Sequence, residues 1–224
     1  MPEEIKVLSG YNELLEHYDQ EHGMQILPAF PSLIATVKMN FNSDINELKK
    51  IKLRPTGVDT STNCYTSNTV NILDEFPVYN QMFLNTYKIF AKKILGFENI
   101  IWKISTSWLT MVDTGGESQL HAHRNSFYSA VYYFDDVQPE HGGVLQIVNL
   151  GLSRPDLYVG TPQHETILNT NSLGYKPEKN LLVFFPSYLQ HKVSRYYGQI
   201  HRYSLAMNFI PIPPFGEHDS TYAL

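Results

Sequence analysis

The sequence predicts a mainly β fold with helices at its N-terminal end, whose strands form an antiparallel sandwich or barrel. Two observations lead to this fold class. Up to about residue 100 the segments are helix-forming, and beyond it short segments rich in β-branched and aromatic residues alternate with turn formers. These later segments are not separated by helices of the length that a parallel crossover requires, which favours antiparallel pairing.

The composition indicates one globular domain. The 224 residues are 42% hydrophobic and 17% charged, with a formal net charge of −5. Cys64 is the only cysteine, which excludes a disulfide framework, a zinc ribbon and a CxxC redox motif. We expect a single domain over residues 1–224, with a helical support region at 1–99 and a β core at 100–215.

Charge and hydropathy argue against several kinds of partner. No apolar run approaches the roughly 20 residues that span a bilayer, so no membrane partner is expected. The opening MPEEIKVLSG has two carboxylates where a secretory signal is positive, and no apolar stretch follows, so a cytoplasmic location is expected. The mildly acidic balance without a Lys and Arg cluster argues against nucleic acid as a partner.

Three helices are predicted in the first hundred residues. The polar segment YNELLEHYDQEH ends before Gly23, and SDINELKK opens with Asp44 and Glu47 in a pattern typical of a helix N-terminus. The longest helix begins at Pro77 and ends before Gly96. Helical spacing predicts that its apolar stripe faces the core. The residues of this stripe are Val78, Met82, Phe83, Phe90 and Ile94.

At least five strands are predicted after residue 100. Their segments are IIWKISTSWLTMV, SFYSAVYYF, GVLQIVNL, NLLVFFP and RYSLAMNFI. All are rich in the residue types that strands prefer. The segment 151–180, between the third and fourth, is rich in Gly, Pro, Asn and Ser and is predicted to be a lid with room for a short hairpin.

Two histidines two residues apart precede the second predicted strand. His121 and His123 lie in QLHAHRNSF, and side chains at this spacing on a strand point to the same side. Two imidazoles so placed can bind one metal ion, although two ordinary polar histidines at a strand start are the alternative. No metal role is predicted for the other histidines outside this pair and His191, which are His17, His22, His141, His164, His201 and His218.

Two further residues are chemically unusual in their surroundings. His191 follows the dense apolar segment LLVFFP, where a histidine on a hairpin rim is the alternative to a metal ligand. Arg202 opens the apolar segment RYSLAMNF, with Ser204 on the same side. A buried arginine requires a carboxylate partner, which is either a ligand carboxylate or a distant acid such as Glu178.

The order HxH, distant His, then Arg-x-Ser resembles that of the 2-oxoglutarate and Fe(II)-dependent oxygenases. The resemblance is closest to a subgroup of putative members from marine bacteria and their phages, which carry HxH followed by a serine-rich strand ending in YY. SFYSAVYYF, GGVLQIVN and LLVFFPSYLQHKV are similar to strands of that subgroup. The resemblance covers residues 100–211 well and the N-terminal third only loosely.

This resemblance implies a double-stranded β-helix, the jelly-roll fold of the cupins, with a metal site at its open end. His121, His123 and His191 would bind Fe(II), with His123 standing where most members have a carboxylate. Asp113 or Glu117 is the alternative ligand if a loop folds back, and Asp135 and Asp136 are the other acids nearby. The residues that would bind the far carboxylate of 2-oxoglutarate are Arg202, Ser204 and Tyr133.

Tyr133 is chosen over Tyr132 because it keeps the parity of the two histidines along the strand, and a bulge between residues 123 and 133 would reverse the choice. The implied activity is that of a dioxygenase that hydroxylates a peptide side chain or a small metabolite and releases succinate and carbon dioxide. Fe(II), 2-oxoglutarate and dioxygen would be required, and ascorbate would stimulate turnover. No catalytic residue is expected beyond the metal site.

Two other functions fit the same residues. A non-catalytic cupin-like module would use the histidines to hold a metal and a carboxylate ligand without consuming dioxygen. A structural jelly roll, of the kind found in capsids, would carry its histidines incidentally, and its melting temperature would not respond to metal.

Overall fold

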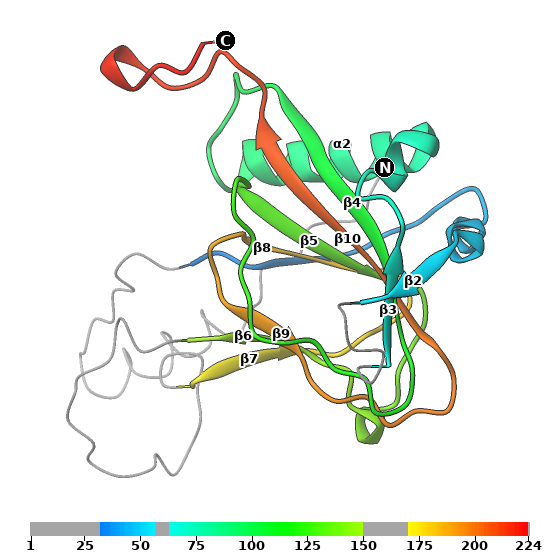
Figure 1. The fold of residues 1–224 in the computed structure, drawn as a ribbon. Coiled ribbons are helices and arrows are strands. Elements are labelled where there is room, and N and C mark those ends of the chain that lie inside the picture. The colour runs from blue at the N-terminus through cyan, green and yellow to red at the C-terminus, as the bar shows by residue number, and fades with distance from the viewer. Residues whose placement is uncertain (1–31, 57–62, 150–169, 224) are drawn as a thin grey trace, which may run out of the picture.

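The computed structural model of the chain describes residues 32–56, 63–149 and 170–223 (Figure 1). Within these ranges it contains ten strands, one α-helix and four short 3-10 helices. The strands are β1 (Ala35–Lys38), β2 (Leu53–Pro55), β3 (Cys64–Ser67), β4 (Trp102–Val112), β5 (Tyr128–Tyr133), β6 (Leu145–Val148), β7 (Ser172–Tyr175), β8 (Leu181–Pro186), β9 (His191–Val193) and β10 (Arg202–Pro211). The helices are α2 (Pro77–Lys93) and the 3-10 segments Ile45–Lys50, Ile72–Glu75, Pro139–His141 and His218–Ser220.

Seven strands form the larger sheet, in the order β1-β8-β5-β10-β4-β3-β2, and each neighbouring pair runs antiparallel. The predicted antiparallel arrangement is therefore confirmed. β10 lies at the centre of this sheet, between β4 and β5 (Figure 1). Its register against β4 shifts between Asn208 and Phe209, which lie opposite Thr106 and Ile104, so the extra residue of this bulge is Ser105 of β4.

Three strands form the smaller sheet, in the order β7-β6-β9, and both pairs are antiparallel. Leu145 and Ile147 of β6 share a buried cluster with three residues of the larger sheet. Those three residues are Tyr133, Val183 and Phe185. The two sheets therefore face each other, and the space between them is the setting of the candidate site.

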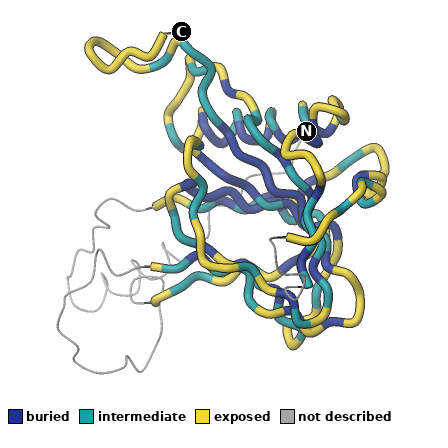
Figure 2. Tube along the Cα trace, in the orientation of Figure 1, coloured by how far each residue is buried: buried dark blue, intermediate teal, exposed yellow. Residues whose placement is uncertain are grey.

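The opposite face of the larger sheet is covered by α2 (Figure 1). Tyr87 of the helix stacks on Phe209 of β10 with ring centroids 4.1 Å apart, and Phe90 stacks on Phe184 of β8 at 5.5 Å. Full burial of such rings contributes roughly 1.5–3 kcal/mol each. The buried residues of Figure 2 accordingly concentrate in the central strands, between the helix and the smaller sheet.

The buried stripe of α2 differs from the predicted one at both ends. Phe83 and Phe90 are buried as predicted, but Val78 is 63% exposed and Ile94 is 38% exposed. Tyr79 and Tyr87 lie on the buried side with Phe83 and Phe90 instead. Tyrosine is amphipathic, so a stripe traced through Val, Met, Phe and Ile alone leaves these two positions out.

All five predicted strands are present, as β4, β5, β6, β8 and β10. The region before residue 100 is less helical than predicted, because its described part also contributes β1, β2 and β3 to the larger sheet. The helix predicted at 44–50 is a 3-10 helix over Ile45–Lys50, with the Asp44 side chain accepting from the backbone N–H of Asn46.

The helix predicted at YNELLEHYDQEH and most of the predicted lid lie outside the described residues, although the last part of the lid contains β7 (Ser172–Tyr175). Among the described helices, none has the length and hydropathy needed to cross a membrane.

Candidate metal centre and its cavity

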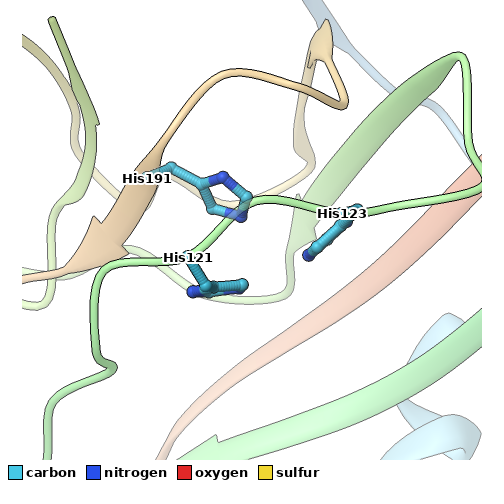
Figure 3. Close-up of side chains that lie close together, drawn as sticks. All are labelled: His121, His123 and His191. Carbon is cyan, nitrogen blue, oxygen red and sulfur yellow. The ribbon is translucent and has the colours of Figure 1, made fainter. Parts of the chain in front are cut away.

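The structure brings His121, His123 and His191 together at one site (Figure 3). Their potential ligand nitrogens all lie within 4.8 Å of one another. His121 and His123 come from the segment between β4 and β5, and His191 opens β9. Within the described ranges, this is the one group of three or more His, Cys, Asp or Glu residues with such a spacing.

Backbone hydrogen bonds hold the distant histidine against the pair. His121 and His191 form an isolated antiparallel bridge, in which each backbone N–H donates to the carbonyl of the other, at 3.0 and 2.8 Å. The backbone N–H of His123 also donates to the carbonyl of Ser187, at 2.9 Å. These backbone hydrogen bonds therefore hold the main chain of the three histidines close together.

The ring nitrogens are oriented for ligation. Nδ1 of His121 lies 2.8 Å from the carbonyl oxygen of Gln119, and Nδ1 of His191 lies 2.9 Å from that of Leu189. A carbonyl oxygen only accepts, so each Nδ1 carries the proton and each Nε2 offers its lone pair. In Figure 3 the three rings point toward a common space, as a facial set of metal ligands requires.

Burial keeps two of these rings neutral. His191 is 4% exposed, and burial lowers its pKa from 6.5 to about 4. Burial also lowers the pKa of His123, which is half-buried. Because the neutral imidazole is the form that binds metals, both rings are ready to bind a metal at neutral pH.

The acids near the cluster in sequence bind elsewhere in the fold. Among the described residues, the histidine group contains none of the four acids Asp113, Glu117, Asp135 and Asp136. Asp113 contacts His201, Glu117 pairs with Arg195 at 2.9 Å, Asp135 pairs with Lys49 at 2.7 Å, and Asp136 accepts from the backbone N–H of Lys179 at 2.8 Å. The group in the structure therefore consists of three neutral side chains.

A single cavity of about 660 Å³ contains the three histidines and also reaches Arg202. Alternate residues of β10, Arg202, Ser204 and Ala206, line it. Ser204 lies opposite Tyr133 of β5 in the sheet register, and Tyr133 also lines the cavity. Tyr132 belongs to the core beneath α2, so of the two tyrosines Tyr133 is the one on the cavity side of β5.

Arg202 is a buried cation without a matched anion among the described residues. It is 2% exposed, and its Nε and Nη2 atoms find no hydrogen-bond partner there, as is also true of the Tyr133 hydroxyl. Nη1 makes one long hydrogen bond of 3.4 Å to the Ser204 hydroxyl. Burial lowers the pKa of Arg202 and raises that of Tyr133. Burying a charge that lacks a counter-ion and hydrogen-bond acceptors costs free energy, unless a ligand supplies the opposite charge.

The alternative prediction, a salt bridge between this arginine and Glu178, is wrong. Glu178 pairs instead with Lys38 on the surface, with a distance of 2.6 Å between nitrogen and oxygen. The unpaired donors of Arg202, the Ser204 hydroxyl and the Tyr133 hydroxyl therefore form a set that suits a carboxylate.

Gly143 is a structural residue of this site that the sequence analysis did not identify. Its φ of +66° lies in the left-handed region, and a Cβ built there would lie 2.9 Å from Cδ of Arg202. The backbone of Gly143 thus lies directly against the arginine stem. The signal in the sequence is the Gly142 and Gly143 pair before β6, because adjacent glycines mark a place where a side chain is not tolerated.

Comparisons with known proteins agree with this geometry. Residues 106–208 match the family model described as "Putative 2OG-Fe(II) oxygenase". The structure of HygX from Streptomyces hygroscopicus with nickel, 2-oxoglutarate and hygromycin B bound superposes with a TM-score of 0.55 at 11% identity, covering 89% of this chain and 86% of that one. No match to a curated protein was found.

Two other solved structures show the same likeness. The epimerase SnoN from nogalamycin biosynthesis has a TM-score of 0.58 at 10% identity, with 89% of this chain and 81% of that chain covered. A prolyl hydroxylase from Trichoplax adhaerens, in complex with a peptide fragment, has a TM-score of 0.54 at 11% identity, with 89% of each chain covered. At these identities the likeness shows the fold, a double-stranded β-helix. The family match covers residues 106–208, which contain the three histidines and Arg202, so this part of the chain is similar to the 2OG-Fe(II) oxygenases.

Proposed function

We propose that the protein is a 2-oxoglutarate-dependent, non-haem Fe(II) dioxygenase that hydroxylates its substrate. The observation that carries this proposal is the cavity itself, which contains a cluster of three metal-binding side chains and a buried, unpaired arginine. A metal ion and a dicarboxylate would satisfy both features at once. The family match supports the same pairing of metal and co-substrate.

Each side chain has a distinct role in the proposal. His121, His123 and His191 hold Fe(II) through Nε2, because their Nδ1 atoms face acceptors in the protein. The guanidinium of Arg202 binds the far carboxylate of 2-oxoglutarate, and the hydroxyls of Ser204 and Tyr133 complete that contact.

When bound, the iron and 2-oxoglutarate supply the oxidising chemistry, in which 2-oxoglutarate and dioxygen yield succinate and carbon dioxide and a substrate C–H becomes C–OH. The chain's own part is to bind and orient. The buried arginine end fixes the direction of the dicarboxylate, and apolar wall residues such as Val131 and Ala206 exclude water beside it.

The neutral ligand set changes the charge of the site. Three imidazoles leave the full charge of a divalent ion, whereas two imidazoles and a carboxylate would leave one positive charge less. The dianionic co-substrate then becomes the main source of negative charge near the ion. We expect metals that prefer imidazole, such as Ni(II), Zn(II) and Cu(II), to compete with iron more strongly at this site.

The substrate we propose is a peptide side chain or a small metabolite. Two of the structural neighbours support these classes, since the Trichoplax adhaerens prolyl hydroxylase is bound to a peptide fragment and HygX is bound to hygromycin B. We also propose a cytoplasmic location, stimulation by ascorbate and a single oxygenase domain over residues 1–224, and no role for nucleic acid.

The proposal is tested by co-substrate turnover. Purified protein with Fe(II), ascorbate and 2-oxoglutarate should release succinate slowly without any substrate. His191→Ala should abolish this release, and His201→Ala should keep it, because His201 lies on the exposed surface against Asp113. Equal succinate release by the His191→Ala variant and the wild type would contradict the ligand assignment.

A non-catalytic, cupin-like binding module is the second candidate, and the neutral ligand set is the observation that favours it. Such a module would bind Fe(II) and 2-oxoglutarate in an anaerobic titration, as the oxygenase would. An oxygen electrode distinguishes the two functions, because only the oxygenase consumes dioxygen after the complex forms.

A further inference from the structure

The Nδ1 atom of His123 faces side chains, whereas those of His121 and His191 face backbone carbonyls. It lies 2.7 Å from Oδ1 of Asn208 and 2.8 Å from the Ser129 hydroxyl. Ser129 also donates to the same Oδ1, at 2.7 Å. On its other side, Nδ2 of Asn208 donates to the Thr106 hydroxyl, at 2.8 Å.

This polar group is enclosed by the fold. Ser129 is fully buried and Asn208 is 8% exposed. Ser129 contacts the hydroxyl of Ser187, which is also fully buried, at 2.8 Å. Neither Asn208 nor Ser129 lines the cavity, so both lie behind His123 and act on a ligand only through its ring.

The orientation of the Asn208 amide decides which nitrogen of His123 can bind a metal. With Oδ1 toward the ring, Nδ1 must carry the proton and Nε2 is left with a lone pair. With the amide reversed, Nδ2 would donate to Nδ1, and the proton of the neutral ring would then lie on Nε2, facing the other histidines. The hydroxyls of Ser129 and Thr106 tolerate both orientations, since a hydroxyl donates or accepts.

We propose that Asn208 is a positioning residue that holds His123 in the tautomer able to bind a metal. The inference rests on the proposed function, because it takes His123 to be a metal ligand. Asn208 does the work for His123 that the Gln119 and Leu189 carbonyls do for the other two rings. It differs from them in being a side chain, so substitution can remove or strengthen its effect.

A calorimetric titration of the full chain with Ni(II) alone measures how much Asn208 contributes to metal affinity. We expect Asn208→Ala to weaken Ni(II) binding by about 10- to 100-fold, the loss typical of removing a partner that orients a metal-binding histidine. Asn208→Asp should bind at least as tightly as the wild type, because a carboxylate only accepts and so keeps the proton on Nδ1. Ser105→Ala is the matched control, since its hydroxyl reaches only the backbone carbonyl of Asn208.

Nitrogen NMR of the metal-free wild type gives a readout that needs no variant. With ¹⁵N-labelled histidine, the His123 ring should show the Nδ1–H tautomer, and Asn208→Ala should shift it toward Nε2–H. An Nε2–H tautomer in the wild type, or equal Ni(II) affinities of Asn208→Ala and the wild type, would overturn the inference. Failure of the wild type to bind Ni(II) at all would instead overturn the proposed function.

Discussion

The guanidinium carbon of Arg202 lies 5.2 Å from the ring centroid of Tyr133, and the two side chains are buried together. The aromatic face stabilises the cation in part, but a ring does not accept the hydrogen bonds that Nε and Nη2 can donate. The pair therefore keeps a positive charge in the cavity without neutralising it. This makes the arginine end of the cavity selective for an anion.

The Tyr133 hydroxyl should contribute directly to co-substrate affinity. A hydrogen bond to a charged group is worth about 1.5–3 kcal/mol, so Tyr133→Phe should weaken 2-oxoglutarate binding at least about tenfold. Tyr132→Phe is the control, because its ring belongs to the core and its hydroxyl donates to Asn180. Calorimetry with 2-oxoglutarate and Ni(II) measures both, and an equal loss in the two variants would contradict the assignment of Tyr133.

Gly143 should be intolerant of even one methyl group. In Gly143→Ala the new Cβ would meet Cδ of Arg202 at 2.9 Å, so the arginine must move away from its position in the cavity. We expect a loss of 2-oxoglutarate affinity of at least about tenfold, or about 1.4 kcal/mol.

Gly96→Ala separates this contact from backbone strain. Gly96 also has a positive φ, +80°, but no atom lies within 4 Å of a Cβ placed there. Its alanine variant should lose stability through strain and keep its co-substrate affinity. If the two variants bind 2-oxoglutarate equally well, Gly143 does not support Arg202.

Metal and co-substrate should bind cooperatively at a site with three neutral ligands. We expect saturating 2-oxoglutarate to tighten Ni(II) binding about tenfold or more, and Ni(II) to tighten 2-oxoglutarate binding by the same factor. Arg202→Gln should reduce this coupling and leave the affinity for Ni(II) alone unchanged, since Arg202 is not among the clustered ligands. Nickel affinities that are the same with and without 2-oxoglutarate would refute the expectation.

The metal-free protein should lose stability in mild acid. Burial lowers the pKa of His191 to about 4 from 6.5, so between these values the unfolded chain binds a proton that the folded chain does not. The free energy of unfolding should therefore fall as the pH decreases from 6.5 to about 4, by on the order of 3 kcal/mol from this residue.

Denaturant unfolding in the presence of a chelator measures this dependence. His191→Gln should show a shallower decline over the same pH range, because glutamine does not titrate. The reverse result, a variant as pH-sensitive as the wild type, would show that other groups dominate acid unfolding.

The two faces of α2 should differ in their contribution to stability. Phe83 is fully buried, so Phe83→Ala should cost about 3–5 kcal/mol. Val78 is 63% exposed, and Val78→Ala should change the free energy of unfolding by less than about 0.5 kcal/mol. Urea titrations of the two variants make the comparison, and a large effect of Val78→Ala would indicate a partner on that face.

The sequence predicted the long strands and the local pair of histidines because both depend on spacing within one segment. His121 and His123 are two residues apart, so a period of two suffices to place them together. β1 and β9, of four and three residues, are too short to show any period. They form because they pair with strands that are distant along the chain.

The rest of the site could not be predicted from local spacing, because it is formed by contacts between residues that are distant along the chain. Nothing near His191 in the sequence indicates the backbone bridge that joins it to His121, and only the resemblance to a family placed the two together. Asn208 did carry a local signal, since a lone amide in the apolar run AMNFI has the same parity as Arg202 and Ser204. The alternation that placed Ser204 beside Arg202 would also have placed Asn208 on their side of the strand.

β10 thus carries both ends of the site on one side, Arg202 at its start and Asn208 six residues later, where the register against β4 shifts. Leu205 and Met207 fill the core on the other side. Deleting any one residue between 203 and 207 would exchange the two sides for part of the strand. The proposed binding of an anion by Arg202, the proposed orienting of His123 by Asn208 and the packing of β10 against α2 would then be lost together. Any gradual change of this site must therefore replace side chains along β10 and keep the length of the strand constant.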